Sequence, residues 1–215
     1  MHTNSKRYLY LPVLALLLIM GSCKKETTKG VSKTLKVPVI ELKGDAFISI
    51  APGSTYTDQG ATYFTEDGTQ EALAASSNEV NTAVPGLYFV TYEKESGSGI
   101  FHTEATRIVA VAYQGNTTDY SGTYLREATG MNAYVTRLLP GFYQVQNPGG
   151  ATGGHTGVKV YFVETAANTF AGPPQPNDLV GDIEFADIVF TSTGASWRII
   201  NNPYYGTGTR TFVKQ

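Results

Sequence analysis

Apolar and polar residues alternate in short runs along most of this chain, and that period is typical of β-strands rather than helices. In residues 87–92, for example, Tyr88, Val90 and Tyr92 fall on one face of an extended segment. Turn signals such as Pro52-Gly53 and Pro85-Gly86 separate the runs at intervals of about ten residues. The pattern predicts a β-sandwich over residues 37–113.

A second β-rich unit is predicted over residues 120–215, after a segment rich in Gly, Asn and Thr at 114–119. Its expected strands are 122–126, 132–139, 141–146, 158–165, 183–191, 196–200 and 209–213. The alternation changes phase within 182–190, which predicts a β-bulge or a break in the strand near Ala186-Asp187. Long irregular loops are expected at 147–157 and 171–179, where binding residues tend to lie. The fold class is therefore all-β: a sandwich followed by a second antiparallel sandwich or a barrel-like domain.

The first 22 residues have the pattern of an export signal. A polar start with Lys6 and Arg7 precedes an apolar run at 11–20 and the small residues Gly21 and Ser22. This run is about half the roughly 20 residues that a membrane span needs.

The next residue is Cys23, the single cysteine of the chain, and this arrangement resembles the lipobox of bacterial lipoproteins. The resemblance implies that residues 1–22 are a lipoprotein signal peptide and that Cys23 is lipidated and becomes the first mature residue. Residues 23–36, rich in Lys and Thr, are then a flexible tether. The alternative is an ordinary signal peptide with an incidental cysteine.

Composition argues against a nucleic-acid partner, because such a partner requires a basic face. The chain has 16 Lys and Arg against 18 Asp and Glu, and loss of Lys6 and Arg7 with the signal makes the balance more negative. Charged residues make up only 16% of the chain, whereas Gly (23), Tyr (14) and Phe (10) are frequent, as in β-proteins.

Two motifs in the first unit carry a family resemblance. Tyr56-Thr57-Asp58 followed by Gly60-Ala61, and the segment Pro85-Gly86-Leu87-Tyr88-Phe89-Val90-Thr91-Tyr92, occur in the order and spacing of a bacterial immunoglobulin-like domain. Such domains are repeated in surface proteins and occur in some pesticidal crystal proteins. The resemblance covers about residues 36–113 and implies an immunoglobulin-like sandwich that acts as a spacer or binding module.

The second unit resembles, less specifically, a group of lipid-anchored proteins of the Bacteroidetes. The resemblance rests on Gly141-Phe142-Tyr143, a Gly-Gly loop, a Trp-containing strand and a terminal Tyr204-Tyr205-Gly206. It implies attachment to the bacterial outer membrane through lipidated Cys23, on either the cell surface or the periplasmic face. It also implies that the protein belongs to a polysaccharide uptake system, together with an outer-membrane transporter and a glycan-binding lipoprotein.

The sequence predicts no catalytic residue, no metal site and no cofactor. Its mature part has only two histidines, His102 and His155, and no His-Glu-x-x-His or Gly-x-Ser-x-Gly motif. Asp182 and Glu184 share one face of a predicted strand. Their spacing suits a glycosidase carboxylate pair, but it also suits the solvent face of an antiparallel strand, which is the preferred interpretation.

The segment around 197–205 is the predicted ligand-binding site. Aromatic rings stack on the C–H faces of sugars and amides bind their hydroxyls. The candidates are Trp197, Asn201, Asn202, Tyr204 and Tyr205. A lone Trp in a small β-domain is more often part of the core. The predicted function is a non-catalytic, glycan-binding accessory of a polysaccharide uptake system. The alternative is a structural or protein-interaction subunit of an envelope complex.

Overall fold

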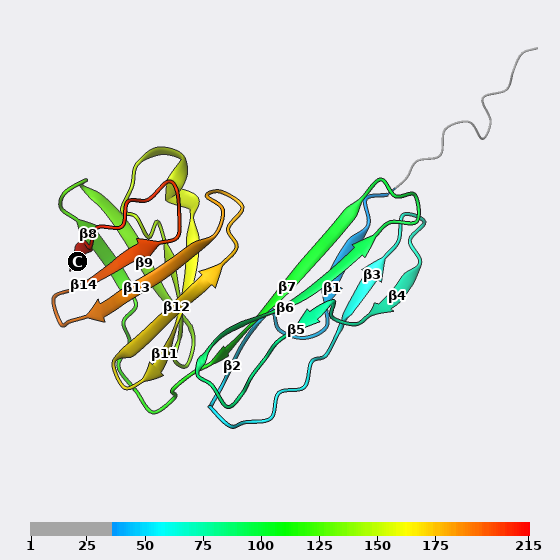
Figure 1. Cartoon of the computed structure of the whole chain (residues 1–215), viewed down its shortest axis with the longest axis horizontal. Coiled ribbons are helices and arrows are strands. Elements are labelled where there is room, and N and C mark those ends of the chain that lie inside the picture. Colours follow the sequence, from blue (N-terminus) through cyan, green and yellow to red (C-terminus); the bar gives the residue numbers. More distant parts are fainter. Residues whose placement is uncertain (1–35) are drawn as a thin grey trace, which may run out of the picture. The chain divides into compact units, whose positions relative to one another are not determined.

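The computed structural model describes residues 36–215. The predicted signal peptide, Cys23 and the tether up to residue 35 lie outside the described residues. The described part contains fifteen β-strands and one short 3-10 helix, and it is all-β as predicted (Figure 1). Among these residues, no helix is long and apolar enough to cross a membrane.

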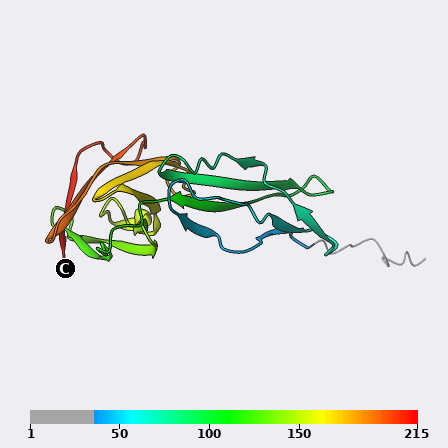
Figure 2. The ribbon, with the colours of Figure 1, turned by 90° about the horizontal axis from the view of Figure 1, so that it is seen from below.

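Two sheets in separate layers form the first unit, a β-sandwich (Figure 2). One sheet has the order β1 (Val39–Leu42), β3 (Ala61–Phe64), β4 (Gln70–Leu73). The other has the order β2 (Phe47–Ile50), β7 (His102–Val111), β6 (Gly86–Glu95), β5 (Ser77–Asn78). Tyr63, Val90, Tyr92 and Val109 are buried between the sheets. Tyr92 and Val90 are two residues apart on β6, so alternation points both inward, as the sequence indicated.

A charged side chain, Arg107, also lies in this core and is fully buried. Its guanidinium group donates hydrogen bonds to the carbonyl oxygens of Asp45 and Lys43 and forms an ion pair with Asp58. The Tyr92 hydroxyl donates to the same carboxylate. The Tyr-x-Asp motif of the sequence therefore has a structural role, since its Asp58 neutralises a buried cation.

Eight antiparallel strands of the second unit close into a barrel. They are β8 (Gly122–Arg126), β9 (Met131–Leu139), β10 (Phe142–Gln146), β11 (Lys159–Ala166), β12 (Thr169–Gln175), β13 (Ile183–Phe190), β14 (Gly194–Ile200) and β15 (Arg210–Lys214). Each strand pairs with its neighbours in sequence, and β15 closes the barrel on β8 through the pairs Val213–Leu125 and Lys214–Tyr124. Of the two predicted alternatives, sandwich or barrel, the structure has the barrel.

Strand β12 was not predicted, because its residues were expected to lie in an irregular loop over 171–179. Pro173 and Pro174 lack the N–H that a strand interior needs. The structure accommodates them by a register shift between Gly172 and Gln175. The side chain of Gln175 then replaces the missing backbone pairing, because its amide binds both the N–H and the carbonyl oxygen of Tyr161, at 2.7 and 2.8 Å.

The predicted β-bulge in β13 is confirmed. The pairing of β13 with β14 shifts register between Ala186 and Val189, and Asp187 has a positive φ of 53°. The extra residue lets Ile183 and Phe185, and then Ile188, all face the barrel interior, where they are buried.

Aromatic side chains fill the barrel interior. Tyr143 stacks on Phe162 with ring centres 5.0 Å apart, and Trp197 stacks on Phe212 at 4.2 Å. Eight strands enclose a space just wide enough for side chains. The barrel therefore has a packed core, and a ligand would have to bind at its ends or on its outer face.

A third apolar cluster joins the sandwich strands to the barrel strands within residues 36–215. Phe142 and Val163 of the barrel pack against residues that include Ile108 and Ala110 of β7. Gly141 lies at this contact with φ of 66°, and a Cβ atom there would come within 2.6 Å of the Tyr113 carbonyl oxygen. Only glycine combines that conformation with so close an approach.

Candidate functional site

The connections of the barrel divide into long loops at one end and tight turns at the other (Figure 1). The end with the long connections is called the loop end here. Its four connections are residues 127–130, 147–158, 176–182 and 201–209. The other end carries the turns at 140–141, 167–168 and 191–193. In an up-and-down barrel every second connection emerges at the same end, so the topology alone brings these four loops together.

Hydrogen bonds tie the loops of the loop end to one another. Thr129 donates to the carbonyl oxygen of Gly150 at 2.6 Å, which joins the first loop to the second. Asn202 donates to the carbonyl oxygens of Val180 and Asp182, at 2.9 and 2.8 Å, which joins the fourth loop to the third. The loop end is therefore a connected surface on a rigid barrel, which is a typical location for a binding site.

Trp197 is the candidate for which the structure departs most from the binding prediction. Its ring is fully buried and packs between Phe185 and Phe212. Its indole N–H donates to the carbonyl oxygen of Pro148 at 2.8 Å, so the polar atom has a partner. Trp197 is a core residue that holds the second loop against the barrel, and it offers no face to a ligand.

Two of the other candidates also have structural partners. The Asn202 amide donates both its hydrogens within the protein, and its oxygen accepts the Tyr204 N–H at 2.9 Å. The Asn201 amide donates to the Glu184 carboxylate. Asn201, with a positive φ of 55°, remains exposed, whereas the hydrogen-bonding groups of Asn202 serve the loop rather than a sugar.

Tyr204 is the candidate that the structure leaves open to a ligand, since it is 65% exposed. Its ring centre lies 5.8 Å from that of His155, which comes from the second loop. Tyr205 is buried, and its ring lies equally close to His155. The second and fourth loops therefore meet at an aromatic contact whose outer member, Tyr204, can stack on a ligand.

Two arginines at the loop end were not predicted from the sequence. Arg126 ends β8 and Arg210 begins β15, and these strands are paired neighbours. Buried Tyr124 and Phe212 mark the inward phase of these two strands. Arg126 lies two residues from the first and Arg210 two residues from the second, so both arginines share the inner face of the barrel. The sequence contained a signal for this position. Arg126 lies two residues after Tyr124 and Arg210 two residues before Phe212, so in an extended strand each arginine points to the same side as an aromatic core residue.

The two carboxylates that the sequence placed on one strand face, Asp182 and Glu184, lie next to the fourth loop. Glu184 accepts a hydrogen bond from Asn201, and Asp182 is exposed. This arrangement fits the solvent face that the sequence analysis preferred over a glycosidase pair. Within residues 36–215, no cluster of three or more His, Cys, Asp or Glu side chains is arranged to hold a metal ion.

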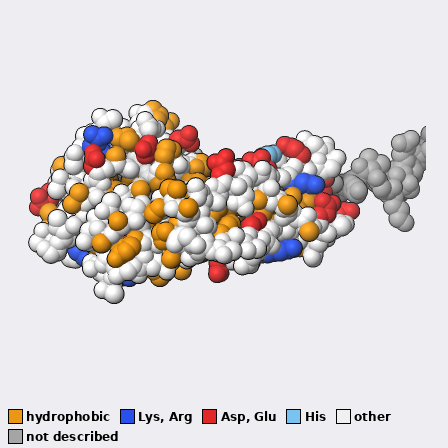
Figure 3. Space-filling view, turned by 60° about the horizontal axis from the view of Figure 1, so that its bottom comes forward, with side chains coloured by type: hydrophobic (Ala, Val, Ile, Leu, Met, Phe, Trp, Pro, Cys, Tyr) orange, Lys and Arg blue, Asp and Glu red, His pale blue; other side chains and the backbone are white. Residues whose placement is uncertain are grey.

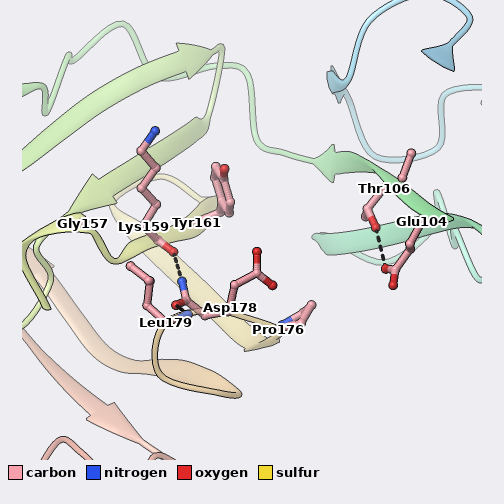
Figure 4. A pocket seen from close by; sticks show the side chains of 10 residues that line it. Glu104, Thr106, Gly157, Lys159, Tyr161, Pro176, Asp178 and Leu179 are labelled. Carbon is pink, nitrogen blue, oxygen red and sulfur yellow. Dashed lines mark hydrogen bonds between the residues drawn. The ribbon is translucent and has the colours of Figure 1, made fainter. Parts of the chain in front are cut away.

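A hollow of about 560 Å³ lies between β7 and the barrel (Figure 4). Glu104 and Thr106 of β7 line one side, and Lys159, Tyr161 and Asp178 line the other. The carboxylates of Glu104 and Asp178 are both exposed to solvent. Neither forms an ion pair within the described residues, and the Glu104 carboxylate accepts a hydrogen bond from Thr106 at 3.4 Å.

Exposed apolar side chains of the barrel come from several strands and loops, and Figure 3 shows hydrophobic side chains spread over one face of this unit. They include Tyr134, Leu179, Val189, Tyr204 and Val213. Leu179 and Tyr204 belong to the loop end, and Tyr134 lines a hollow with Asn147 and Thr156 of the second loop. Val189, 51% exposed, lies at the other end of the barrel, next to the turn at 191–193, and is thus a comparison for Tyr204 outside the loop end.

Comparisons with known proteins address the sandwich most directly. Residues 40–111 match the family model described as the Ig-like domain of bacterial surface proteins. Among solved structures, the chain is similar to the lipoprotein BT2262 from Bacteroides thetaiotaomicron, with 20% identity, a TM-score of 0.38, and coverage of 83% of this chain and 100% of that one. No curated protein matches the chain. The predicted immunoglobulin-like resemblance is confirmed: the sandwich is an Ig-like domain of the bacterial surface type.

Proposed function

We propose that this chain is a lipid-anchored, non-catalytic protein of the cell envelope whose barrel binds a glycan at its loop end. The Ig-like domain of bacterial surface type supports a place in the envelope. The signal pattern ending at Cys23 supports an acyl anchor. An outer-membrane location and a role beside a polysaccharide transporter belong to the same proposal and rest on the sequence resemblance.

The single observation that carries the binding proposal is the exposed Tyr204 on a surface made of four connected loops. An exposed aromatic ring on a rigid platform loses little conformational freedom when a sugar ring stacks on it. The packed interior excludes a ligand from the barrel lumen, and of the remaining surfaces the loop end is the one that carries the exposed Tyr204 ring. Anchoring through Cys23 would raise the local concentration of captured glycan near a membrane transporter.

Binding is tested by affinity gel electrophoresis of the full chain in detergent micelles, with polysaccharides cast into the gel. We expect one or more polysaccharides to retard the chain, and Tyr204→Ala to weaken that binding by about three- to tenfold, since aromatic stacking contributes roughly 0.5–1.5 kcal/mol beyond burial. Val189→Ala, at an exposed apolar side chain near the turn between β13 and β14, is the control and should leave retardation unchanged. Unretarded migration with every polysaccharide would contradict glycan binding and favour the protein-interaction alternative.

The anchor has its own test. Cells that express the full chain and are fed an alkyne-labelled fatty acid should incorporate the label into the wild-type protein. Cys23→Ser should abolish incorporation, because the acyl acceptor is the cysteine thiol, whereas Ser22→Ala should retain it. Equal labelling of wild type and Cys23→Ser, or an unlabelled wild type, would show that Cys23 carries no lipid.

A further inference from the structure

Arg210 at the loop end is buried without an acidic partner. Its side chain is only 7% exposed. Its two terminal nitrogens donate to the carbonyl oxygens of Gly208 and Gly206, at 3.1 and 2.9 Å. Its Nε is buried and donates to no group within residues 36–215. A buried guanidinium group with an unused donor is costly, because its hydration is lost and not replaced.

Tyr205, which contacts Arg210, also has a buried hydrogen-bond donor without an acceptor in the described part of the chain. It is 8% exposed, and its hydroxyl is buried with no hydrogen-bond partner among the described residues. The Arg210 guanidinium carbon lies 5.5 Å from the centre of the Tyr205 ring. Burial raises the pKa of Tyr205, so its hydroxyl keeps its proton at neutral pH and can donate. Two buried donors without partners in residues 36–215 therefore belong to neighbouring side chains.

A second cation adds to this surplus of positive charge. Arg126 is half-buried and donates to the carbonyl oxygen of Gly149 at 2.8 Å. A Cβ atom at Gly149 would come within 2.4 Å of the Tyr205 ring, so Arg126 and Tyr205 meet on the same short segment. Burial, and then the charge of Arg126, lower the pKa of Arg210.

Two other arginines of the chain show what is missing here. Fully buried Arg107 is paired with Asp58, and Arg198, whose side chain is 39% exposed, has the carboxylate of Asp187 at 3.1 Å although its Nε makes no well-aligned hydrogen bond within the described residues. Arg126 and Arg210 form no ion pair within residues 36–215. A site that collects two guanidinium groups and a hydroxyl donor and provides no counter-charge is suited to an anion from outside the chain.

We infer that the side-chain cluster of Arg126, Tyr205 and Arg210 binds the carboxylate group of an acidic glycan, so the ligand contains uronic acid. This inference rests on the proposed glycan-binding function and names its ligand class. The planar fork of a guanidinium group matches the two oxygens of a carboxylate. Tyr204, the next residue along the chain, stacks on a sugar ring adjacent to that carboxylate.

The loop that covers this cluster is open to solvent. Gly206 and Gly208 accept hydrogen bonds from Arg210 through their carbonyl oxygens, and the space where a side chain would stand is open at both glycines. A small shift of this Gly-Thr-Gly segment would expose Nε of Arg210 and the hydroxyl of Tyr205, the two donors without partners within residues 36–215, while Arg126 already reaches the surface. The ligand carboxylate then accepts hydrogen bonds from these two donors.

The test measures binding by calorimetry with the full chain in detergent micelles. The probes are oligomers of galacturonate, of mannuronate and of the glucuronate-containing hyaluronate, each beside its methyl ester, which keeps the sugar rings and removes the charge. Sodium acetate is the probe for a bare carboxylate. At least one acid oligomer should bind tightly, with its ester and acetate weaker by at least about tenfold, since a charge-assisted hydrogen bond contributes roughly 1.5–3 kcal/mol.

Substitutions of single arginines test whether the carboxylate binds at the cluster of Arg126, Tyr205 and Arg210. Arg126→Gln should weaken binding of the acid oligomer by about ten- to hundredfold and leave binding of its ester unchanged. Arg210→Gln should act in the same direction in protein whose circular dichroism spectrum is native. Arg137→Gln, a half-buried arginine near the turn end of β9, is the control and should change nothing.

Each contrary result has its own meaning. Equal affinity for acid and ester would overturn the acidic-glycan inference and leave the proposed function standing. If an acid oligomer binds tightly and Arg126→Gln does not alter its affinity, the carboxylate does not bind at the cluster of Arg126, Tyr205 and Arg210. No binding of acids or esters, combined with no retardation by any polysaccharide, would overturn both the inference and the proposed function.

Discussion

Trp197→Ala should lower the free energy of unfolding by about 3–5 kcal/mol, the cost typical of removing a large buried aromatic side chain. The ring is fully buried, stacks on Phe212 with centres 4.2 Å apart, and donates to the carbonyl oxygen of Pro148. Its removal leaves a cavity and also frees the second loop of the loop end. The measurement is urea unfolding followed by far-ultraviolet circular dichroism, because Trp197 is the single tryptophan of the chain.

Tyr204→Ala is the matched control for Trp197→Ala. Tyr204 is mostly exposed and its side chain donates no hydrogen bond within the described residues, so its loss should change stability by less than about 0.5 kcal/mol. The pair of variants separates the core from the binding surface. A small stability loss in Trp197→Ala together with loss of binding would instead mean that Trp197 contacts the ligand directly.

Arg107→Met should be comparably destabilising, by about 3–5 kcal/mol, because it leaves the Asp58 carboxylate without its cation. The substitution also leaves the carbonyl oxygens of Asp45 and Lys43 without a donor. The control is Lys94→Met, which removes an exposed 3.5 Å pair with Glu71 and should cost less than about 1 kcal/mol. Similar losses in the two variants would contradict the structural role assigned to the Arg107–Asp58 pair.

The same pair should make stability depend on acid pH. Burial alone would raise the pKa of Asp58, but hydrogen bonds from Tyr92 and Tyr56 and the charge of Arg107 outweigh it and lower that pKa. The stabilisation is thus present above the unfolded pKa of about 3.9 and is lost as pH falls through the lower folded value. The stability gap between wild type and Arg107→Met should therefore narrow below about pH 4, and a constant gap would contradict this cause.

Local alternation of apolar and polar residues predicted most strands. The features that it did not predict depend on contacts between residues far apart in the sequence. Alternation located seven of the eight barrel strands, and a phase change located the bulge at Asp187. Strand β12 was missed because Pro173 and Pro174 signal a loop, and its pairing depends on the side chain of Gln175 reaching Tyr161. Closure of β15 on β8 likewise joins residues far apart in the chain, so alternation alone could not distinguish a barrel from a sandwich.

The candidate site was predictable in its location but less so in its residues. The composition of the segment 201–206 indicated a binding loop, and Tyr204 is exposed there. Burial of Trp197 and Tyr205, and the engagement of Asn202, depend on contacts with Pro148, Gly149 and Val180 on other loops. No local pattern reports such contacts. Arg126 and Arg210 come together for the same reason, because β8 and β15 are opposite ends of the barrel sequence.

Hydrogen–deuterium exchange of the full chain tests most directly whether the loop end is the binding surface, as proposed. Exchange is compared with and without the polysaccharide that retards the chain most strongly. We expect slower exchange in residues 147–158 and 201–209, with exchange in the sandwich strands unchanged. Protection confined to the sandwich, to the hollow lined by Glu104 and Asp178, or absent from the whole chain would contradict it.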